Sequence, residues 1–249
     1  MTLLPGIDVS NYQGQPDWSA IAGSGMQFAA VMFTQGAGPF VDVDAASDWA
    51  ALKANGMARI AYHYCVPSQN ATADEVAWFL KNLSPLEVGD CIWCDLEDDP
   101  SGPTGTEDYS AWLIAWLQAV EAALGFKPIL YARAEYLVRH NCANNPTIMQ
   151  YGLAIAAYQG TAPTNLDGWP FFAFWQSGTG TVPGVAGPCD LDWFNGTVDQ
   201  LRLYGLQTVT PPPVKPTPTN NDLVYFAKFL FNPSGPDLAG LNTAIAPFL

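Results

Sequence analysis

Apolar runs alternate with amphipathic segments through the first half of the chain. Short apolar runs, which are typical of buried strands, lie at 6–10, 28–36, 58–66, 90–98 and 127–133. Segments whose apolar residues recur with helical spacing begin near 17, cover 42–56, 72–83 and 106–125, and end near 142. Most of them start at Asp or Thr and finish at Gly or Asn, which are common capping residues. This alternation predicts five strand–helix units and therefore a parallel sheet.

The next three strand candidates lie closer together, at 151–159, 171–179 and 189–196. The gaps between them are rich in Gly, Pro and Thr, and a parallel crossover with a helix needs about a dozen residues or more. We therefore expect no helices between these strands and a short helix after them, at 197–205. Eight strands are enough for the sheet to close into a barrel. The expected fold class is α/β, a modified TIM-like barrel of five βα units followed by three β-strands.

The composition changes after residue 209, where we place the end of the barrel domain, 1–209. Residues 210–219, "TPPPVKPTPT", predict a proline-rich linker in the extended polyproline II conformation. Residues 220–249 carry an apolar patch but are too few to form a core alone. We expect this segment to dock on the barrel, on a second copy of the chain or on a protein partner.

Charge and composition exclude several classes of partner. The 249 residues, 49% of them apolar, carry 23 acidic and nine basic side chains, a formal charge of -14. This balance argues against binding to nucleic acid or to anionic membranes. No apolar run is long enough to insert in a membrane, and the N-terminus lacks the features of a classical export signal. The five cysteines lie mostly in apolar runs, so we expect buried free thiols.

Acidic side chains crowd the end of the fourth predicted strand, "CIWCDLEDD". Asp95 and Glu97 stand two positions apart, so they project from the same face of a strand. The carboxyl ends of barrel strands open on the substrate cleft, and paired carboxylates there suit hydrolysis of a glycosidic bond. A D-x-E pattern alone is weak, because it arises by chance in many acidic chains.

Two further aspartates strengthen this interpretation. Asp8 follows the first apolar strand, and Asp190 opens the last strand candidate. If the last strand is antiparallel, its start lies at the barrel end where the other strands finish, so both aspartates meet Asp95 and Glu97. Four carboxylates in one cleft raise the pKa of at least one of them, which provides a general acid near neutral pH.

A set of short motifs resembles glycoside hydrolase family 25, the Chalaropsis-type lysozymes, many of them phage endolysins. The motifs are "GIDVSNYQG", "AYHY", "DLE", "ILYA", "FWQSGTG" and "CDLDWFNG", in this order over about residues 5–205. The resemblance implies an N-acetylmuramidase that cleaves the β-1,4 bond between N-acetylmuramic acid and N-acetylglucosamine in peptidoglycan. It also implies Glu97 as proton donor, Asp95 as partner carboxylate, Asp8 and Asp190 as further cleft acids, and no metal or cofactor.

Aromatic side chains near the predicted strand ends are candidates for sugar contacts. With the resemblance, we expect the substrate-binding residues to be Tyr62, Tyr64, Tyr131, Trp175 and Gln176. His63 points away from its tyrosine neighbours, because successive side chains of a strand alternate between faces. We therefore expect it to be structural rather than catalytic.

The sequence departs from the family pattern at two places. Phe33 and Gln35 stand where relatives commonly carry a lysine and a glutamate, which changes local substrate contacts more than the reaction. Asp192 stands where relatives often carry asparagine, and we expect it to be a surface or turn residue.

Two alternatives remain open. A chitinase-like hydrolase also carries a D-x-E after its fourth strand, but it extends the motif backwards with acids where this chain has Ile92, Trp93 and Cys94. A non-catalytic wall-binding or structural phage component would be expected to lack a catalytic carboxylate, and this chain retains all four. The missing export signal leads us to expect a phage-encoded enzyme that reaches the wall through a holin pore or as part of a virion.

Overall fold

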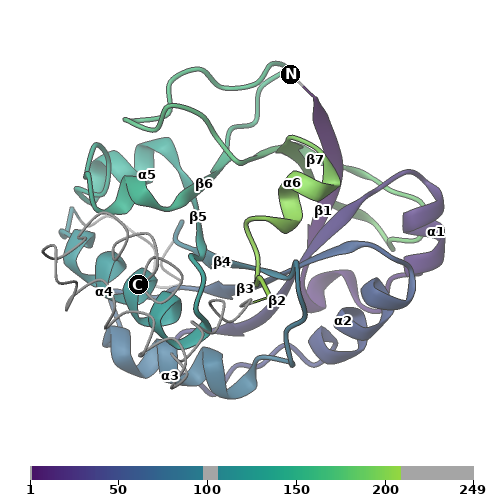
Figure 1. Ribbon diagram of the computed structural model, residues 1–249, viewed down its shortest axis with the longest axis horizontal. Helices are drawn as coiled ribbons and strands as arrows, with labels where there is room; N and C mark the ends of the chain where they lie inside the picture. Colours follow the sequence, from purple (N-terminus) through teal and green to yellow (C-terminus); the bar gives the residue numbers. More distant parts are fainter. Residues whose placement is uncertain (1, 98–105, 209–249) are drawn as a thin grey trace, which may run out of the picture. The chain divides into compact units, whose positions relative to one another are not determined.

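Eight strands form a closed barrel in the computed structural model, which describes residues 2–97 and 106–208 (Figure 1). Each strand pairs with its neighbours in sequence, and the last pairs with the first. The strands are β1 (Leu3–Val9), β2 (Phe28–Gln35), β3 (Ala58–Tyr64), β4 (Cys91–Asp95), β5 (Ile129–Arg133), β6 (Gly152–Ala156), β7 (Phe174–Thr181) and β8 (Pro188–Asn195). The predicted barrel is confirmed.

Helices follow each of the first five strands and surround the barrel (Figure 1). They are α1 (Trp18–Gly23), α2 (Ala45–Ala54), α3 (Thr72–Asn82), α4 (Ser110–Leu124) and α5 (Ala134–Arg139). Two 3-10 turns, η1 (Asn11–Gln13) and η2 (Ile148–Gln150), precede α1 and β6, and α6 (Val198–Arg202) follows β8. The connections between β6, β7 and β8 are described in full and contain no helix, as the sequence predicts.

Strand direction changes only at the end of the described barrel. The pairs from β1 to β7 are parallel, and β8 runs antiparallel to both β7 and β1. β7 runs parallel to β6 even without a crossover helix, because the connection 157–173 is long enough to return the chain to the opposite end. The reversal of β8 aligns Asp190 with Asp8.

Side-chain alternation divides the apolar residues into an inner and an outer core. Inside the barrel, Phe28, Trp93 and Phe174 pack with other inward side chains. The outer core lies between the strands and the helices. Cys91 belongs to the inner core and Cys94 to the outer one, as their spacing predicts, and all five cysteines are buried and free.

The barrel belongs to one compact unit, Met1–Gln207. Within the described residues, no helix combines the length and apolar character that crossing a bilayer requires. The predicted linker 210–219 and the segment 220–249 lie outside the described residues, so the domain boundary at 209 and the docking role of the last segment stay predictions.

Candidate active site

A cavity of about 460 Å³ opens at the barrel end where the parallel strands finish. Its lining brings together the four carboxylates expected from the sequence, Asp8, Asp95, Glu97 and Asp190. Three strands position them. β1 and β4 end at or near this edge, and β8 begins there because it runs in the opposite direction.

Asp8 and Asp190 are partners across the antiparallel pair of β1 and β8. Burial raises the pKa of Asp8 to about 7, and the negative charge of Asp190 adds to this effect. The amide nitrogen of Gln176 opposes it by donating to Asp8 Oδ2 over 2.7 Å. Burial also raises the pKa of Asp190, while the Tyr158 hydroxyl opposes the rise by donating to Asp190 Oδ1 over 3.0 Å.

Asp95 is the last residue of β4, and Glu97 lies two residues beyond it. Asp95 is only 6% exposed, and burial raises its pKa well above the usual range, with the charge of Glu97 as the next cause. Glu97 Oε2 lies 3.5 Å from the Tyr131 hydroxyl and 3.5 Å from Arg133 Nε. Two interacting carboxyls lose their protons in separate steps, so this pair can retain one proton near neutral pH.

Gln176 connects the carboxylates to the aromatic wall of the cavity. Its carbonyl oxygen accepts from the hydroxyls of Tyr131 and Tyr158, each over 2.8 Å, while its amide nitrogen donates to Asp8. The side chain is 4% exposed, so these bonds form largely out of water and fix its orientation.

Four of the five predicted substrate-binding residues line the cavity: Tyr62, Tyr64, Tyr131 and Gln176. The prediction for Trp175 is wrong. Alternation along β7 turns Phe174 and Gln176 into the barrel and Trp175 outwards, where its ring belongs to the outer core. The Trp175 indole nitrogen donates to the carbonyl oxygen of Ala157 over 2.8 Å. The error arose from treating the end of β7 as the cavity rim without following its alternation.

The prediction that Asp192 is a surface or turn residue is also wrong. β8 continues to Asn195, so Asp192 shares the inward face of the strand with Asp190. It pairs with Gly6 on one side and Gln176 on the other, and it is 1% exposed.

Several cavity residues were missed in the sequence. Tyr12, on the turn after β1, lines the cavity and is 89% exposed, and Tyr158 lies in the connection after β6. Arg133 could have been found from its position two residues after Tyr131 on the same strand. Gln35 lines the cavity, whereas Phe33 packs edge-on against Trp49 in the outer core.

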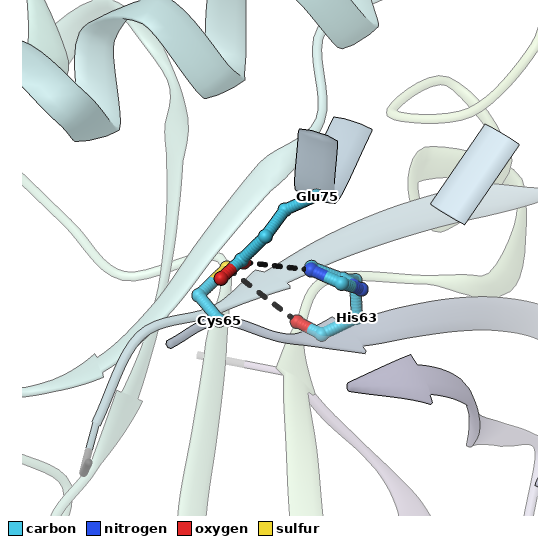
Figure 2. A group of neighbouring side chains, drawn as sticks. All are labelled: His63, Cys65 and Glu75. Atoms are coloured by element: carbon cyan, nitrogen blue, oxygen red, sulfur yellow. Dashed lines mark hydrogen bonds and ion pairs between the residues drawn. The ribbon is translucent and has the colours of Figure 1, made fainter. Parts of the chain in front are cut away.

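His63 lies on the outer face of β3 and is fully buried against α3, as expected for a structural residue. Its Nε2 lies 2.9 Å from Glu75 Oε2, and its Nδ1 lies 2.8 Å from the Thr34 hydroxyl. Figure 2 shows His63, Cys65 and Glu75, whose potential ligand atoms lie within 4.8 Å of one another. The Val66 backbone N–H also donates to Glu75. Because the imidazole and the carboxylate already have partners, we interpret this cluster as a hydrogen-bond network that joins β3 to α3.

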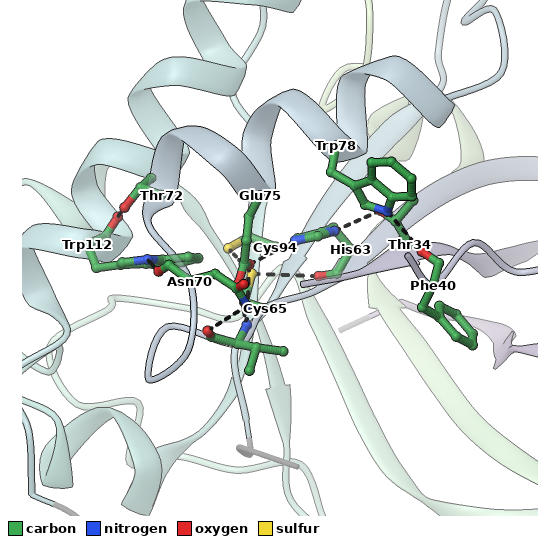
Figure 3. Close-up of polar contacts among 11 residues, drawn as sticks. Thr34, Phe40, His63, Cys65, Asn70, Thr72, Glu75, Trp78, Cys94 and Trp112 are labelled. Carbon is green, nitrogen blue, oxygen red and sulfur yellow. Dashed lines mark hydrogen bonds and ion pairs between the residues drawn. The ribbon is translucent and has the colours of Figure 1, made fainter. Parts of the chain in front are cut away.

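Polar contacts continue along α3 beyond this cluster (Figure 3). The Trp78 indole donates to the Phe40 carbonyl oxygen over 2.9 Å, and the Trp112 indole donates to the Asn70 carbonyl oxygen over 3.0 Å. The first bond attaches α3 to the β2–α2 connection, and the second attaches α4 to the connection before α3. Together with the contact between Glu75 and His63, they fix α3 behind β3, the strand that carries Tyr62.

The sequence that carries this cavity matches a known family. Residues 7–185 match the model of Glycosyl hydrolases family 25. The chain belongs to this family. It is 34% identical over 207 residues to the uncharacterized protein YegX of Escherichia coli (strain K12), covering 81% of this chain and 73% of that protein. It is 29% identical over 213 residues to lysozyme M1 of Streptomyces globisporus, covering 82% and 72%.

Solved structures of lysozymes share the barrel. The bacterial lysozyme from Streptomyces coelicolor superposes with a TM-score of 0.75 at 26% identity, covering 82% of this chain and 97% of that one. The family GH25 lysozyme from Aspergillus fumigatus gives a TM-score of 0.74 at 26% identity, covering 83% and 100%. The protein is therefore a glycoside hydrolase of the lysozyme type.

Proposed function

We propose that this glycoside hydrolase is an N-acetylmuramidase that cleaves the β-1,4 bond between N-acetylmuramic acid and N-acetylglucosamine in peptidoglycan, with Glu97 as proton donor. The observation that carries the proposal is the position of Glu97 and Asp95 at the end of β4, facing Asp8 and Asp190 across one cavity. The names of two relatives, lysozyme M1 and the N,O-diacetylmuramidase of Arthroderma benhamiae, support the same substrate class.

Glu97 is placed to protonate the leaving glycosidic oxygen. Its side chain is 21% exposed and lines the cavity, while Tyr131 and Arg133 flank its Oε2 and limit its rotation. A general acid needs both access to the substrate and a proton at working pH. Burial and the charge of Glu97 raise the pKa of Asp95, so the pair has a proton available, and in the proposed reaction Glu97 carries it while Asp95 is ionised.

Asp95 is the partner carboxylate in the proposed reaction. In the proposed first step, the carbonyl oxygen of the substrate's 2-acetamido group bonds to the anomeric carbon as the glycosidic bond breaks, and the Glu97 proton passes to the leaving oxygen. The Asp95 carboxylate then stabilises the positively charged cyclic intermediate. In the second step water attacks the anomeric carbon and gives a proton to Glu97, while the bond between that carbon and the acetamido oxygen breaks, which regenerates the 2-acetamido group and restores the site.

Release of reducing ends from purified peptidoglycan tests the proposal, with the wild type and Glu97→Gln compared side by side. We expect an active wild type and a folded variant that has lost at least about 100-fold in rate, since a general acid contributes about 10²–10⁴-fold. Glu107→Gln is the matched control, because Glu107 is an exposed glutamate outside the cavity lining. Its rate should equal that of the wild type.

The new reducing end identifies the bond that is cleaved. Borohydride reduces the sugar at the new reducing end to an alcohol, and mass spectrometry should identify that sugar as N-acetylmuramic acid. Reduced N-acetylglucosamine would contradict the proposed bond. Cleavage of chitin with no action on peptidoglycan would favour a chitinase-like activity. Binding to the wall without any release of sugar would indicate a non-catalytic wall-binding protein and would contradict the proposal. The phage origin, release through a holin and docking through 220–249 remain predictions.

A further inference from the structure

Asp192 is a buried carboxyl next to residues that line the cavity, and neither the sequence motifs nor the proposed reaction assigns it a role. It lies between Gly6 of β1 and Gln176 of β7, on the same inward face as Asp190. Gly6 offers no side chain, and the space that its Cβ would need is filled by the Phe28 ring, 2.5 Å away. Asp192 thus occupies an interior position bordered by the Phe28 ring and by the polar side chains of Gln176 and Asp190.

The Asp192 carboxyl has no hydrogen-bond donor among the described residues. Neither oxygen accepts a bond, and the residue is 1% exposed. The neighbouring amide of Gln176 directs its N–H to Asp8 instead. An ionised carboxylate without a donor in such a place would carry a large desolvation penalty. A neutral carboxylic acid avoids this penalty and gains one O–H donor.

Asp8 lies two residues from Gly6, the partner of Asp192 on β1, so it shares the inward face, and its carboxyl can form a side-chain hydrogen bond with Asp192 when one of the two carries a proton. We propose that Asp192 stays protonated at working pH and donates its O–H to Asp8, acting as a positioning residue that keeps Asp8 ionised and oriented. Asp8 then receives two donors, the Asp192 hydroxyl and the Gln176 amide, from neighbouring strands.

The charges around Asp192 agree with this assignment. Burial raises the pKa of Asp192 well above its usual range, and the charges of Asp8 and Asp190 raise it further. The other titratable groups that its charge influences are the Tyr131 hydroxyl on β5 and the Cys189 thiol, which lies on the outer face of β8. Both are neutral when protonated, and burial raises the pKa of each, so neither supplies a cation that could hold Asp192 ionised.

This role rests on the proposed function, in which positive charge develops near the anomeric carbon. An ionised Asp8 next to the cavity would favour that charge, whereas a protonated Asp8 would not. Asp192 therefore acts through Asp8 and does not touch the substrate. Asparagine at this position would keep a donor for Asp8, whereas an apolar residue would remove it.

The pH dependence of kcat/KM on soluble peptidoglycan fragments distinguishes these cases. We expect Asp192→Leu to move the acidic limb of the profile upwards by about one pH unit, because Asp8 loses a hydrogen bond that favours its ionised form. Asp192→Asn retains an N–H donor and should leave the limb where the wild type has it. Asp199→Asn, the same substitution at an exposed position on α6, is the control. If the acidic limb of the kcat/KM profile lies at the same pH in the Leu and Asn variants, the proposal is wrong.

Infrared difference spectroscopy tests the protonation state without any need for activity or for a stable Leu variant. At neutral pH, the difference between wild type and Asp192→Asn should contain the C=O stretch of a protonated carboxylic acid, and Asp199→Asn should show a carboxylate loss instead. If Asp192→Asn removes only a carboxylate band, Asp192 is ionised and the proposal is wrong. An inactive wild type that shows the protonated band would contradict the muramidase proposal while leaving the protonation of Asp192 supported.

Discussion

Gln176 donates to Asp8 over 2.7 Å although 168 positions separate the two residues in the chain. The bond crosses the inner face of β8, which lies between their strands, β7 and β1. It can form only when the barrel is closed, so the last parallel strand positions a carboxylate on the first. This hydrogen bond therefore both orients a cavity carboxylate and joins the strands at which the barrel closes.

Asp8 should make the fold less stable as the pH rises. Its pKa is about 7 in the folded protein against an ordinary value of 3.8. Its stabilising contribution is thus fully present below 3.8 and is lost as the pH rises through about 7. Asp8→Asn should raise the Tm by several degrees at about pH 8, since each pKa unit corresponds to about 1.4 kcal/mol, and should bring no gain at about pH 4. Calorimetry at both pH values checks this, and an equal gain at both would refute it.

The Tyr158 hydroxyl should matter for activity more than for stability. Its single hydroxyl proton is shared between Gln176 Oε1, at 2.8 Å, and Asp190 Oδ1, at 3.0 Å, and the residue is 56% exposed. Tyr158→Phe should lower kcat/KM by roughly 3–10-fold, since it removes this shared donor from a neutral group and a charged group. The pKa of Asp190 should rise, because the hydroxyl favours its ionised form. Tyr204→Phe, far from the cavity lining, is the control for loss of a tyrosine hydroxyl, and equal kcat/KM values in the two variants would contradict the prediction.

The same alternation rule explains what could and what could not be predicted from the sequence. Asp95 and Glu97 were found because two-residue spacing at a strand end fixes their common direction. Trp175 was assigned to the wrong face of its strand, and Asp192 was placed beyond the end of a strand that in fact continues. Because side chains alternate, an error of one residue in facing reverses the predicted direction of every side chain in the strand. Tyr158 was missed because it lies on a connection without regular structure, whose path depends on tertiary packing and leaves no periodic signal.

Glu75 should be essential for stability and neutral for catalysis. It is fully buried and accepts from the Val66 backbone, with His63 at 2.9 Å. Glu75→Leu would leave these groups without an acceptor and should lower the free energy of unfolding by about 2–5 kcal/mol. Urea unfolding measures the loss. The pH profile of kcat/KM for the folded fraction should match the wild type, and a shifted profile would mean that His63 acts in the reaction.

Glu75→Gln is the matched control for this change. Its amide oxygen can still accept from the Val66 N–H, so the loss of stability should be smaller than in the leucine variant. A glutamine variant that is as unstable as the leucine variant would show that the charge of Glu75, rather than its hydrogen bonds, supports the network.

Arg59 and Asp90 should form a coupled pair that supports the end of the barrel opposite the cavity. Arg59 donates from Nε and from an Nη to the two oxygens of Asp90, over 2.8 and 2.6 Å, and its guanidinium lies 4.4 Å from the centre of the Trp49 ring. Both residues are buried. Asp90→Leu should lower the free energy of unfolding by about 3–5 kcal/mol, because it leaves the buried guanidinium with only the half-exposed Glu87, 3.6 Å away, as an acidic partner.

The double variant Arg59→Met with Asp90→Leu separates pairing from simple loss of contacts. An apolar pair of similar volume removes both charges from the interior, so the double variant should be more stable than the Asp90→Leu single variant. Additive losses in denaturant unfolding would mean that the two side chains act independently. The kcat/KM of all three variants should match the wild type under conditions where each is folded. The pair lies at the start of β3 and β4, whereas the cavity opens at the barrel end where these strands finish.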